Sequence, residues 1–170
     1  MKRLNLLISV ALLLILSMTA FAQKAKSTAK KPISQPAAVS ALELREGADK
    51  VSIQIKNVTK FLYMLGGIAY GIEDLDTQAN TQTLPRTTLD ANMANKAKVM
   101  QAIRNLRAGI ATLEVEFRTK PSLKKFLPQI DGITRISAEC EDLAAADRFS
   151  DSGQPLLILV EKLSDALAAM

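Results

Sequence analysis

The stretch that decides the fold is LREGADKVSIQIKNVTKFLYMLGGIAYGI, residues 44–72. Apolar residues recur in it at alternating spacings of four and three: Leu44, Ala48, Val51, Ile55, Val58, Leu62, Leu65, Ala69 and Ile72. A mean spacing of about 3.5 residues is the heptad pattern of helices that pack side by side with a left-handed twist. The stretch therefore predicts one long helix, from about residue 41 to about residue 75, with a seam for neighbouring helices.

A second long helix follows, with the same spacing on Val99, Ile103, Leu106, Ile110, Leu113 and Phe117. We expect it to end near Arg118. The segment between the two helices, DTQANTQTLPRT (residues 76–87), is polar and contains a proline, so it predicts a loop. Thr87, with Asp90 three residues later, resembles a capping box that would start the second helix.

Two further apolar stripes complete the pattern. The third helical region carries Phe126, Ile130, Ile133, Ile136, Cys140 and Leu143, and the last helix carries Leu156, Leu159, Val160, Leu163, Leu167 and Met170. Pro128 and Gly132 predict a kink or a restart in the third region, and Pro155 suits the first turn of the last helix. The sequence predicts an all-α, up-and-down four-helix bundle with heptad-type packing, long first and second helices, a kinked third and a short fourth.

The expected helix lengths do not match. If the helices alternate in direction, the short last helix starts beside the C-terminal half of the first helix. The N-terminal half, with Leu44, Val51 and Ile55, then lacks a fourth neighbour. We expect that half to fray or to be covered by another molecule.

Residues 1–22 have the features of a cleavable signal peptide. Lys2 and Arg3 precede the apolar run LNLLISVALLLILSMT, and Ala20-Phe21-Ala22 forms an A-x-A cleavage site. The alternative is an uncleaved anchor, because the uncharged run approaches the ~20 residues that cross a bilayer. We expect cleavage after Ala22 and a periplasmic or secreted protein.

Residues 23–40, QKAKSTAKKPISQPAAVS, contain four lysines and no acidic residue. Such a segment cannot bury enough apolar surface to order itself, so we interpret it as a flexible basic linker before a bundle domain over residues 41–170. Six of the 22 basic residues precede Ala41, so the bundle carries 16 basic and 17 acidic residues. We therefore expect no nucleic-acid binding, which needs a basic face, and at most peripheral membrane contact through the linker.

The segment FLYMLGGIAYGIEDL, residues 61–75, raises the question of a binding surface because its first twelve residues are apolar or small on every side of the helix. The positions that face away from the seam are Tyr63, Met64, Gly67, Tyr70 and Gly71. Gly67 and Gly71 are four residues apart, a spacing that lets a second backbone approach closely. Tyr63 and Tyr70 would form amphipathic walls beside them.

Three explanations for this segment stay open. The chain covers the patch itself with the loop or another helix; another protein or a second copy docks there; or the glycines widen a groove for a small apolar ligand or lipid. Tyr63, Met64, Gly67, Tyr70 and Gly71 are therefore the candidate interaction surface.

Residue types that catalyse reactions or hold cofactors are scarce. The chain has no histidine, which removes the usual haem ligand, the di-iron E-x-x-H pairs and histidine-based triads. The acidic groups at residues 73–76, 114–116 and 139–142 are typical of solvated helix faces. Cys140 lies on an apolar stripe, which predicts a buried side chain. The sequence predicts no catalytic, cofactor-binding or metal-ligating residue, and we do not expect an enzyme.

The sequence as a whole favours an exported, non-catalytic helical bundle. It would act through protein-protein or self-association contacts on the first helix. The alternative is a periplasmic carrier or sensor bundle that holds a small apolar ligand or lipid near Tyr63, Met64 and Tyr70.

Overall fold

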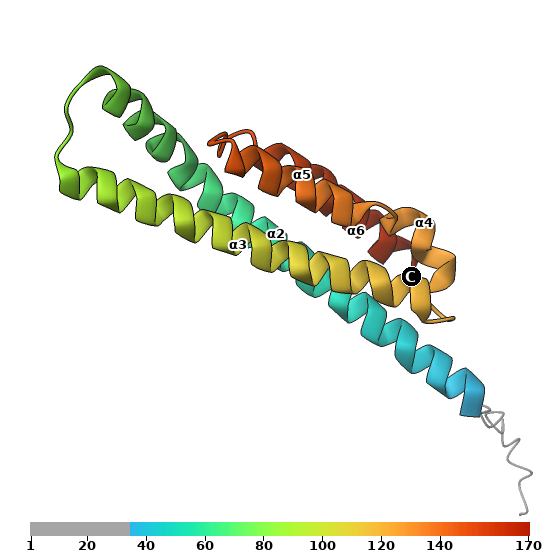
Figure 1. Ribbon diagram of the computed structural model, residues 1–170. Coiled ribbons are helices and arrows are strands. Elements are labelled where there is room, and N and C mark those ends of the chain that lie inside the picture. The colour runs from blue at the N-terminus through green and yellow to red at the C-terminus, as the bar shows by residue number, and fades with distance from the viewer. Residues whose placement is uncertain (1–34) are drawn as a thin grey trace, which may run out of the picture. The chain divides into compact units, whose positions relative to one another are not determined.

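The structure is a computed structural model that describes residues 35–170; the predicted signal peptide and residues 23–34 of the predicted linker lie outside this range. Every regular element in the range is a helix: α2 (Gln35–Thr81), α3 (Arg86–Thr119), the 3-10 turn η1 (Lys124–Phe126), α4 (Leu127–Ile130), α5 (Ile133–Ala145) and α6 (Gly153–Ala169). α2 and α3 form a long antiparallel hairpin, and α4, α5 and α6 return along it (Figure 1). The predicted all-α four-helix bundle is confirmed.

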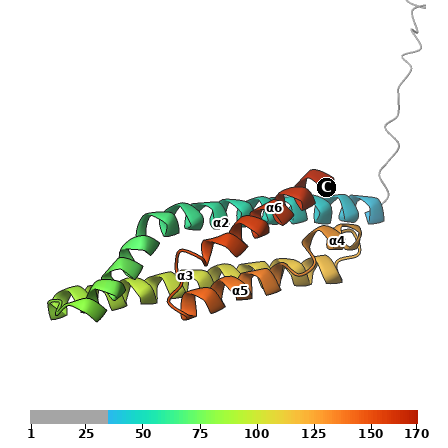
Figure 2. The same ribbon diagram turned by 90° about the horizontal axis from the view of Figure 1, so that it is seen from above.

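The four main helices pack in a ring. α2 packs against α3 and α6, and α5 packs against the same two helices from the opposite corner (Figure 2). Their seam residues fill the core, among them Val51, Val58, Leu65, Ile103, Ile110, Phe117, Ile136, Leu159 and Leu163. The heptad positions predicted from the sequence are therefore the positions that hold the bundle together.

α2 begins earlier than predicted. It starts at Gln35, so residues 35–40 of the predicted linker are helical. Ala37 and Ala38 in this segment are the strongest helix formers. The alanines of the predicted linker therefore favour the helix that contains them.

α2 also ends later than predicted. Gln78 Nε2 donates to Asp74 Oδ2 at 2.7 Å, an i,i+4 side-chain bond that favours the helix. The Thr77 and Thr81 hydroxyls donate to the carbonyls of Glu73 (2.9 Å) and Gln78 (3.1 Å). Only residues 82–85 form the connection, and α3 starts at Arg86 after Pro85. No side chain caps this start, so the expected capping box is wrong.

The third helical region restarts where the sequence predicted. α4 ends at Ile130, and Gly132 takes the left-handed conformation, with φ of 82°, before α5 begins. Glycine adopts this conformation without steric cost. The chain can therefore change direction between the short α4 and the longer α5.

The expectation that the N-terminal half of the first helix lacks a fourth neighbour is wrong. α6 begins with Gly153 near Leu62 and Leu65, and the chain after it brings Met170 against Gly47. Its 17 residues span about 25 Å of α2. α5 and α6 leave both ends of α2 uncovered: residues 37–42 are exposed where α2 begins, and the α2–α3 turn extends past α5 and α6 in both views (Figures 1 and 2).

Polar contacts hold the end at the α2–α3 turn together. Asn92, one heptad before the seam residue Val99, is buried and donates to the carbonyl of Ile72 at 3.3 Å and to Asp76 Oδ1 at 2.9 Å. Lys96 Nζ lies 2.6 Å from Asp76 Oδ2 and 2.9 Å from Asp147 Oδ1. Burial alone would lower the pKa of Lys96, but the two carboxylates outweigh it and raise the pKa. A buried polar side chain in a seam fixes the register of the two helices.

Candidate functional site

The five residues predicted as an interaction surface lie on the side of α2 that faces away from the bundle. Tyr63 is 86% exposed, Tyr70 is 73% exposed and Met64 is 47% exposed. Gly67 and Gly71 are also exposed. We call these five residues the glycine face. The opposite side of the same turns is buried against α3 and α6, so one stretch of helix is apolar both inside and outside.

The glycines of this face are open. A Cβ atom at Gly66, Gly67 or Gly71 would meet no atom of another element within 4 Å. At Gly47, by contrast, a Cβ atom would lie 2.6 Å from Leu123 Cδ2. Within residues 35–170, neither the α2–α3 connection nor α6 covers Gly67 or Gly71. The explanation that the chain covers this patch itself is therefore wrong for the part of the chain described.

Two surface grooves border the glycine face, one along its α6 flank and one on the α3 side of its N-terminal end. The groove on the α6 flank has a volume of about 210 Å³, and Gly66, Tyr70 and Leu157 are among its lining residues. The groove on the α3 flank has a volume of about 410 Å³, and Lys60 and Met64 help to line it. The side chains of the face thus stand between two depressions that can receive side chains of a partner.

The sequence prediction missed the contribution of α6. Leu157 and Ile158 are 61% and 50% exposed, and Leu157 extends the apolar surface from α2 onto α6. A signal for this was present in PLLILV, residues 155–160, because six successive apolar residues are more than one face of a helix can bury.

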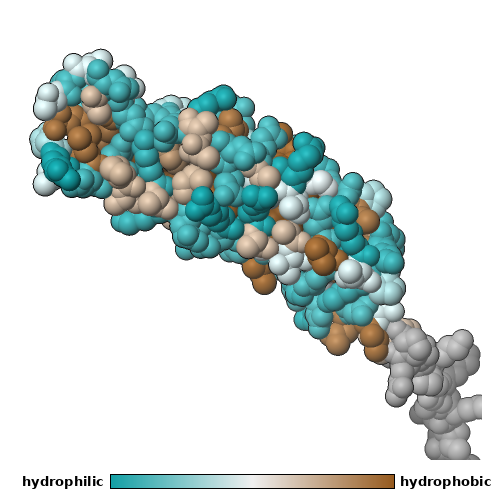
Figure 3. All heavy atoms as spheres, in the orientation of Figure 1, coloured by the Kyte–Doolittle hydropathy of each residue, from teal (hydrophilic) through white to brown (hydrophobic). Residues whose placement is uncertain are grey.

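Other exposed apolar side chains are scattered over the surface. Figure 3 shows one face of the molecule as a mosaic of hydrophobic and hydrophilic residues. Val39 and Leu42 lie near the start of α2, and Met93 and Val115 lie on α3. Single exposed apolar residues are normal on a protein surface. The glycine face differs because large exposed side chains and open glycines alternate over about two helical turns.

Opposite charges stand at the two ends of the glycine face. Lys60 lies seven residues before Gly67 and Asp74 lies seven residues after it, and both are exposed. Neither forms an ion pair with residues 35–170; Asp74 accepts a hydrogen bond from Gln78 Nε2 at 2.7 Å. The face therefore has a cation at its N-terminal end and an anion at its C-terminal end.

The expectation that the acidic groups are solvated is wrong for Glu114. This carboxylate is 5% exposed and accepts hydrogen bonds from the backbone N–H groups of Gly132 (3.2 Å) and Thr134 (2.9 Å), and from Arg118. Burial alone would raise the pKa of Glu114, but these hydrogen bonds outweigh burial and hold the pKa below its ordinary value. Glu114 ties α3 to the start of α5, which is a structural role.

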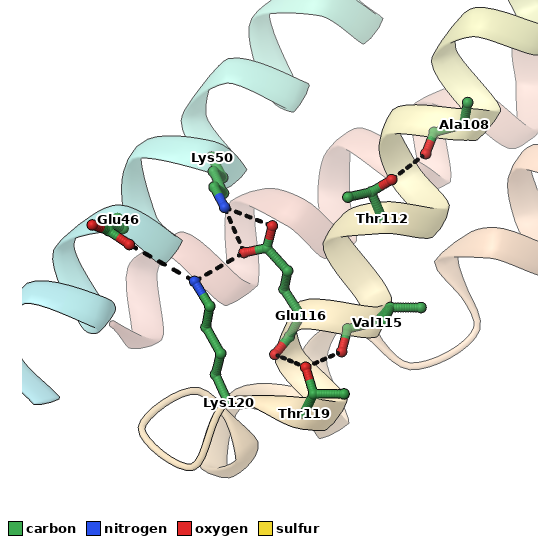
Figure 4. Close-up of polar contacts among 8 residues, drawn as sticks. All are labelled: Glu46, Lys50, Ala108, Thr112, Val115, Glu116, Thr119 and Lys120. Carbon is green, nitrogen blue, oxygen red and sulfur yellow. Dashed lines mark hydrogen bonds and ion pairs between the residues drawn. The ribbon is translucent and has the colours of Figure 1, made fainter.

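Glu116 joins α3 to α2 in the same way (Figure 4). Its Oε2 atom lies 2.6 Å from Lys50 Nζ and 3.3 Å from Lys120 Nζ, and Lys120 reaches Glu46 at 3.7 Å. The hydrogen bond from Lys50 lowers the pKa of Glu116, and Lys120 lowers it further. Both of its charged neighbours, Lys50 on α2 and Lys120 after α3, are cations that pair with the carboxylate, so Glu116 ties the two helices together.

The remaining reactive groups do not form a site. Cys140 is buried, as predicted, and burial raises the pKa of its thiol to about 12. A thiol with so high a pKa stays protonated and is a poor nucleophile. Within residues 35–170, no three histidine, cysteine or carboxylate side chains gather where they could hold a metal ion. None of the helices in the same range has the length and apolar character that a membrane span needs.

Comparison with known proteins gives no match. The chain fits no known family model, and no curated protein or solved structure is significantly similar to it.

Proposed function

We propose that the protein is an exported, non-catalytic helical bundle that acts by binding a helix of another protein molecule on the glycine face. The observation that carries the proposal is the exposure of Tyr63, Met64 and Tyr70 around glycines that contact no other element. A contiguous exposed apolar patch is typical of an interaction site. A helix is the partner that fits, because glycine lets a second backbone approach closely while the side chains beside it enclose the partner.

The alternative, a carrier or sensor that holds a small apolar molecule, has less support. Ligand sites usually bury most of the ligand in a concave pocket. The two grooves beside the glycine face lie on the surface, and the space between the helices is filled by buried side chains such as Phe61 and Leu65. Lipid extraction from the purified protein, followed by mass spectrometry, would detect a carried molecule at a stoichiometric amount.

Export is supported by the sequence of residues 1–22, with its basic start, apolar core and A-x-A site. The test is the intact mass of the protein purified from cells that express the full chain. A mass that begins at Gln23 supports cleavage and release. A mass that retains residues 1–22, found in the membrane fraction, supports the anchor instead.

Site-specific photo-crosslinking in the expressing cells tests the binding role. A benzophenone amino acid replaces Tyr63 or Tyr70 in two variants, and Lys98 in a third variant that serves as control, since Lys98 is exposed on α3. We expect protein adducts from positions 63 and 70 and none from position 98. The adducts should disappear when Gly67→Leu is added, because a leucine there blocks the close approach of a helix.

Two outcomes of the crosslinking experiment would contradict the proposal. Equal adducts from all three positions would mean random collisions, and no adduct from positions 63 and 70 would mean that no protein docks there. Circular dichroism of each Gly67→Leu variant shows whether the fold is intact, so a loss of adduct can be assigned to the surface.

A further inference from the structure

We infer that the partner on the glycine face is a second copy of this chain, whose α2 runs antiparallel to the first about a two-fold axis at Gly67. The inference deepens the proposed function and rests on it, since both use the same surface. It is carried by the way the chemistry of this surface repeats on either side of Gly67, which makes the surface complementary to itself.

Residues seven apart lie almost directly above one another on a helix, so the outer side of α2 consists of three rows. The central row is Lys60, Gly67 and Asp74. Tyr63 and Tyr70 form the row toward α6, where Tyr70 lines the groove. Met64 and Gly71 form the row toward α3, where Met64 lines the other groove.

The two-fold axis lies midway between the two helices at the level of Gly67, perpendicular to both helices and to the line that joins them. It reverses the direction of the helix but keeps each outer row on its own side. The residues that meet across the axis then follow from their distances from Gly67 in the sequence. Tyr63 is four residues before Gly67 and Tyr70 is three after it, so each Tyr63 stands beside Tyr70 of the other copy. Two aromatic side chains in contact pack favourably.

The row toward α3 pairs a knob with a notch. Met64 is three residues before Gly67 and Gly71 is four after it, so the reversed copy places each Met64 over Gly71 of the other copy. Gly71 has no atom of another element within 4 Å of the place where a Cβ would be. The flexible methionine side chain therefore has space to enter.

The central row supplies the charge complementarity. Gly67 meets Gly67 at the crossing point, where the absence of side chains brings the two backbones together. Lys60 and Asp74 are each seven residues, about 10.5 Å, from that point. Each lysine therefore faces the aspartate of the other copy, and the dimer gains two ion pairs. A parallel pair would instead place lysine opposite lysine and aspartate opposite aspartate.

The proposed contact is small. One helical face from each copy is smaller than the standard interface of about 1,600 Å² in total. We therefore expect a dimer that dissociates on dilution. A two-fold contact uses the same patch on both molecules and closes on itself, so association stops at two copies.

Charge reversal tests the antiparallel arrangement. The protein is purified from cells that express the full chain, and its mass is measured by light scattering after size exclusion over a concentration series. Lys60→Glu alone and Asp74→Lys alone should each raise the dissociation constant about tenfold, because each puts two like-charge pairs in the interface. The double variant, Lys60→Glu with Asp74→Lys, should dimerise like the unchanged chain.

Mixing supplies a second test. The Lys60→Glu and Asp74→Lys variants repel their own kind, but a mixed pair places the introduced glutamate opposite the introduced lysine and leaves the native Lys60 opposite the native Asp74. We expect mixed dimers to form at concentrations at which each variant alone is monomeric. Lys98→Glu, which reverses an exposed charge on α3, is the matched control and should leave the dissociation constant unchanged.

Three results would overturn the inference. They are a monomer at every concentration, a dimer that neither single charge reversal weakens, or a dimer in which Lys98→Glu has the same effect as Lys60→Glu. Photo-crosslinking distinguishes this failure from failure of the proposed function. An adduct between the benzophenone at position 63 and a different protein would support the docking role and reject self-association. The absence of any adduct would reject both.

Discussion

Gly47 and Gly67 belong to the same helix, twenty residues apart, yet their surroundings are opposite. Gly47 is buried, and a Cβ atom there would lie 2.6 Å from Leu123 Cδ2 and 3.1 Å from Met170 Cε. Gly67 is exposed, and no other element comes within 4 Å of the same position. The first glycine makes room for the chain itself, and the second leaves room for something outside it.

The two glycines destabilise the helix equally, but only one of them is compensated by packing within the molecule. Each glycine weakens a helix by about 0.5–1 kcal/mol relative to alanine. At Gly47 this cost is offset inside the molecule, because the close packing of Leu123 and Met170 depends on it. At Gly67 nothing in residues 35–170 offsets it. The docking role proposed above would supply a compensation from outside the molecule.

The largest expected effect comes from the inner side of the turn that carries the glycine face. Leu65→Ala should lower the free energy of unfolding by about 2–5 kcal/mol, because Leu65 is 2% exposed and its removal leaves a cavity. Met64→Ala, one residue away on the outer side, should change it by less than about 0.5 kcal/mol. Urea unfolding followed by circular dichroism measures both. Equal losses would mean that Met64 is part of the core.

The second prediction compares the two glycines directly. Gly47→Leu should lower the free energy of unfolding by about 1–3 kcal/mol or more, because the buried Leu123 has little space to move. Gly67→Leu should not lower it, since leucine favours the helix, the position is exposed and the added Cβ meets nothing within 4 Å. Thermal unfolding of both variants checks this. A destabilised Gly67→Leu variant would show that the glycine face packs inside the monomer.

The third prediction concerns the ion pairs near Gly47. The pKa of Glu116 is lowered in the folded protein, so its stabilisation is complete above the ordinary carboxyl pKa of 4.5 and is lost as the pH falls through the lowered value. Glu116→Gln should reduce stability at neutral pH by up to about 1 kcal/mol and flatten its decline in acid. Urea unfolding at a series of pH values measures this. An unchanged acid profile in Glu116→Gln would contradict the assignment.

The smallest expected effect separates stability from association. Gly67→Ala should raise the free energy of unfolding by about 0.5–1 kcal/mol, since alanine is the better helix former and the added methyl group meets no other element. The same methyl group at the crossing point should weaken the dimer. Denaturation of the dilute monomer and light scattering at high concentration should therefore move in opposite directions. A variant in which both improve would place the crossing point away from Gly67.

The seam of the bundle could be predicted from the sequence, because a heptad pattern repeats over many turns of α2 and α3 and one error does not hide it. The helix ends could not, since each depends on a few local bonds. Residues 35–40 are helical although their composition resembles a linker, and the i,i+4 bond from Gln78 to Asp74 favours the helix past its predicted end. The burial of Glu114 was missed because its partners Gly132 and Thr134 come from a later helix.

The five residues of the glycine face were predictable for the same reason as the seam, because the face opposite a heptad seam follows from the same period. The period does not show whether another element covers that face. Leu157 and the two grooves depend on where α6 and α3 lie beside α2, which only the folded structure shows. The charge pattern around Gly67 was present in the sequence but has meaning only once the face is known to be exposed.

The pairing of α2 with α6, the first and last helices of the bundle, has a consequence for the order of folding. α2 leaves the ribosome first, but its seam stays open on one side until α6, more than seventy residues after the end of α2, has been made. The α2–α3 hairpin is a local structure that forms fast, whereas closure by α6 is a late, long-range step. A chain exported as proposed would therefore still lack its closing helix while its N-terminus is being recognised, and would remain loose enough to be threaded across a membrane.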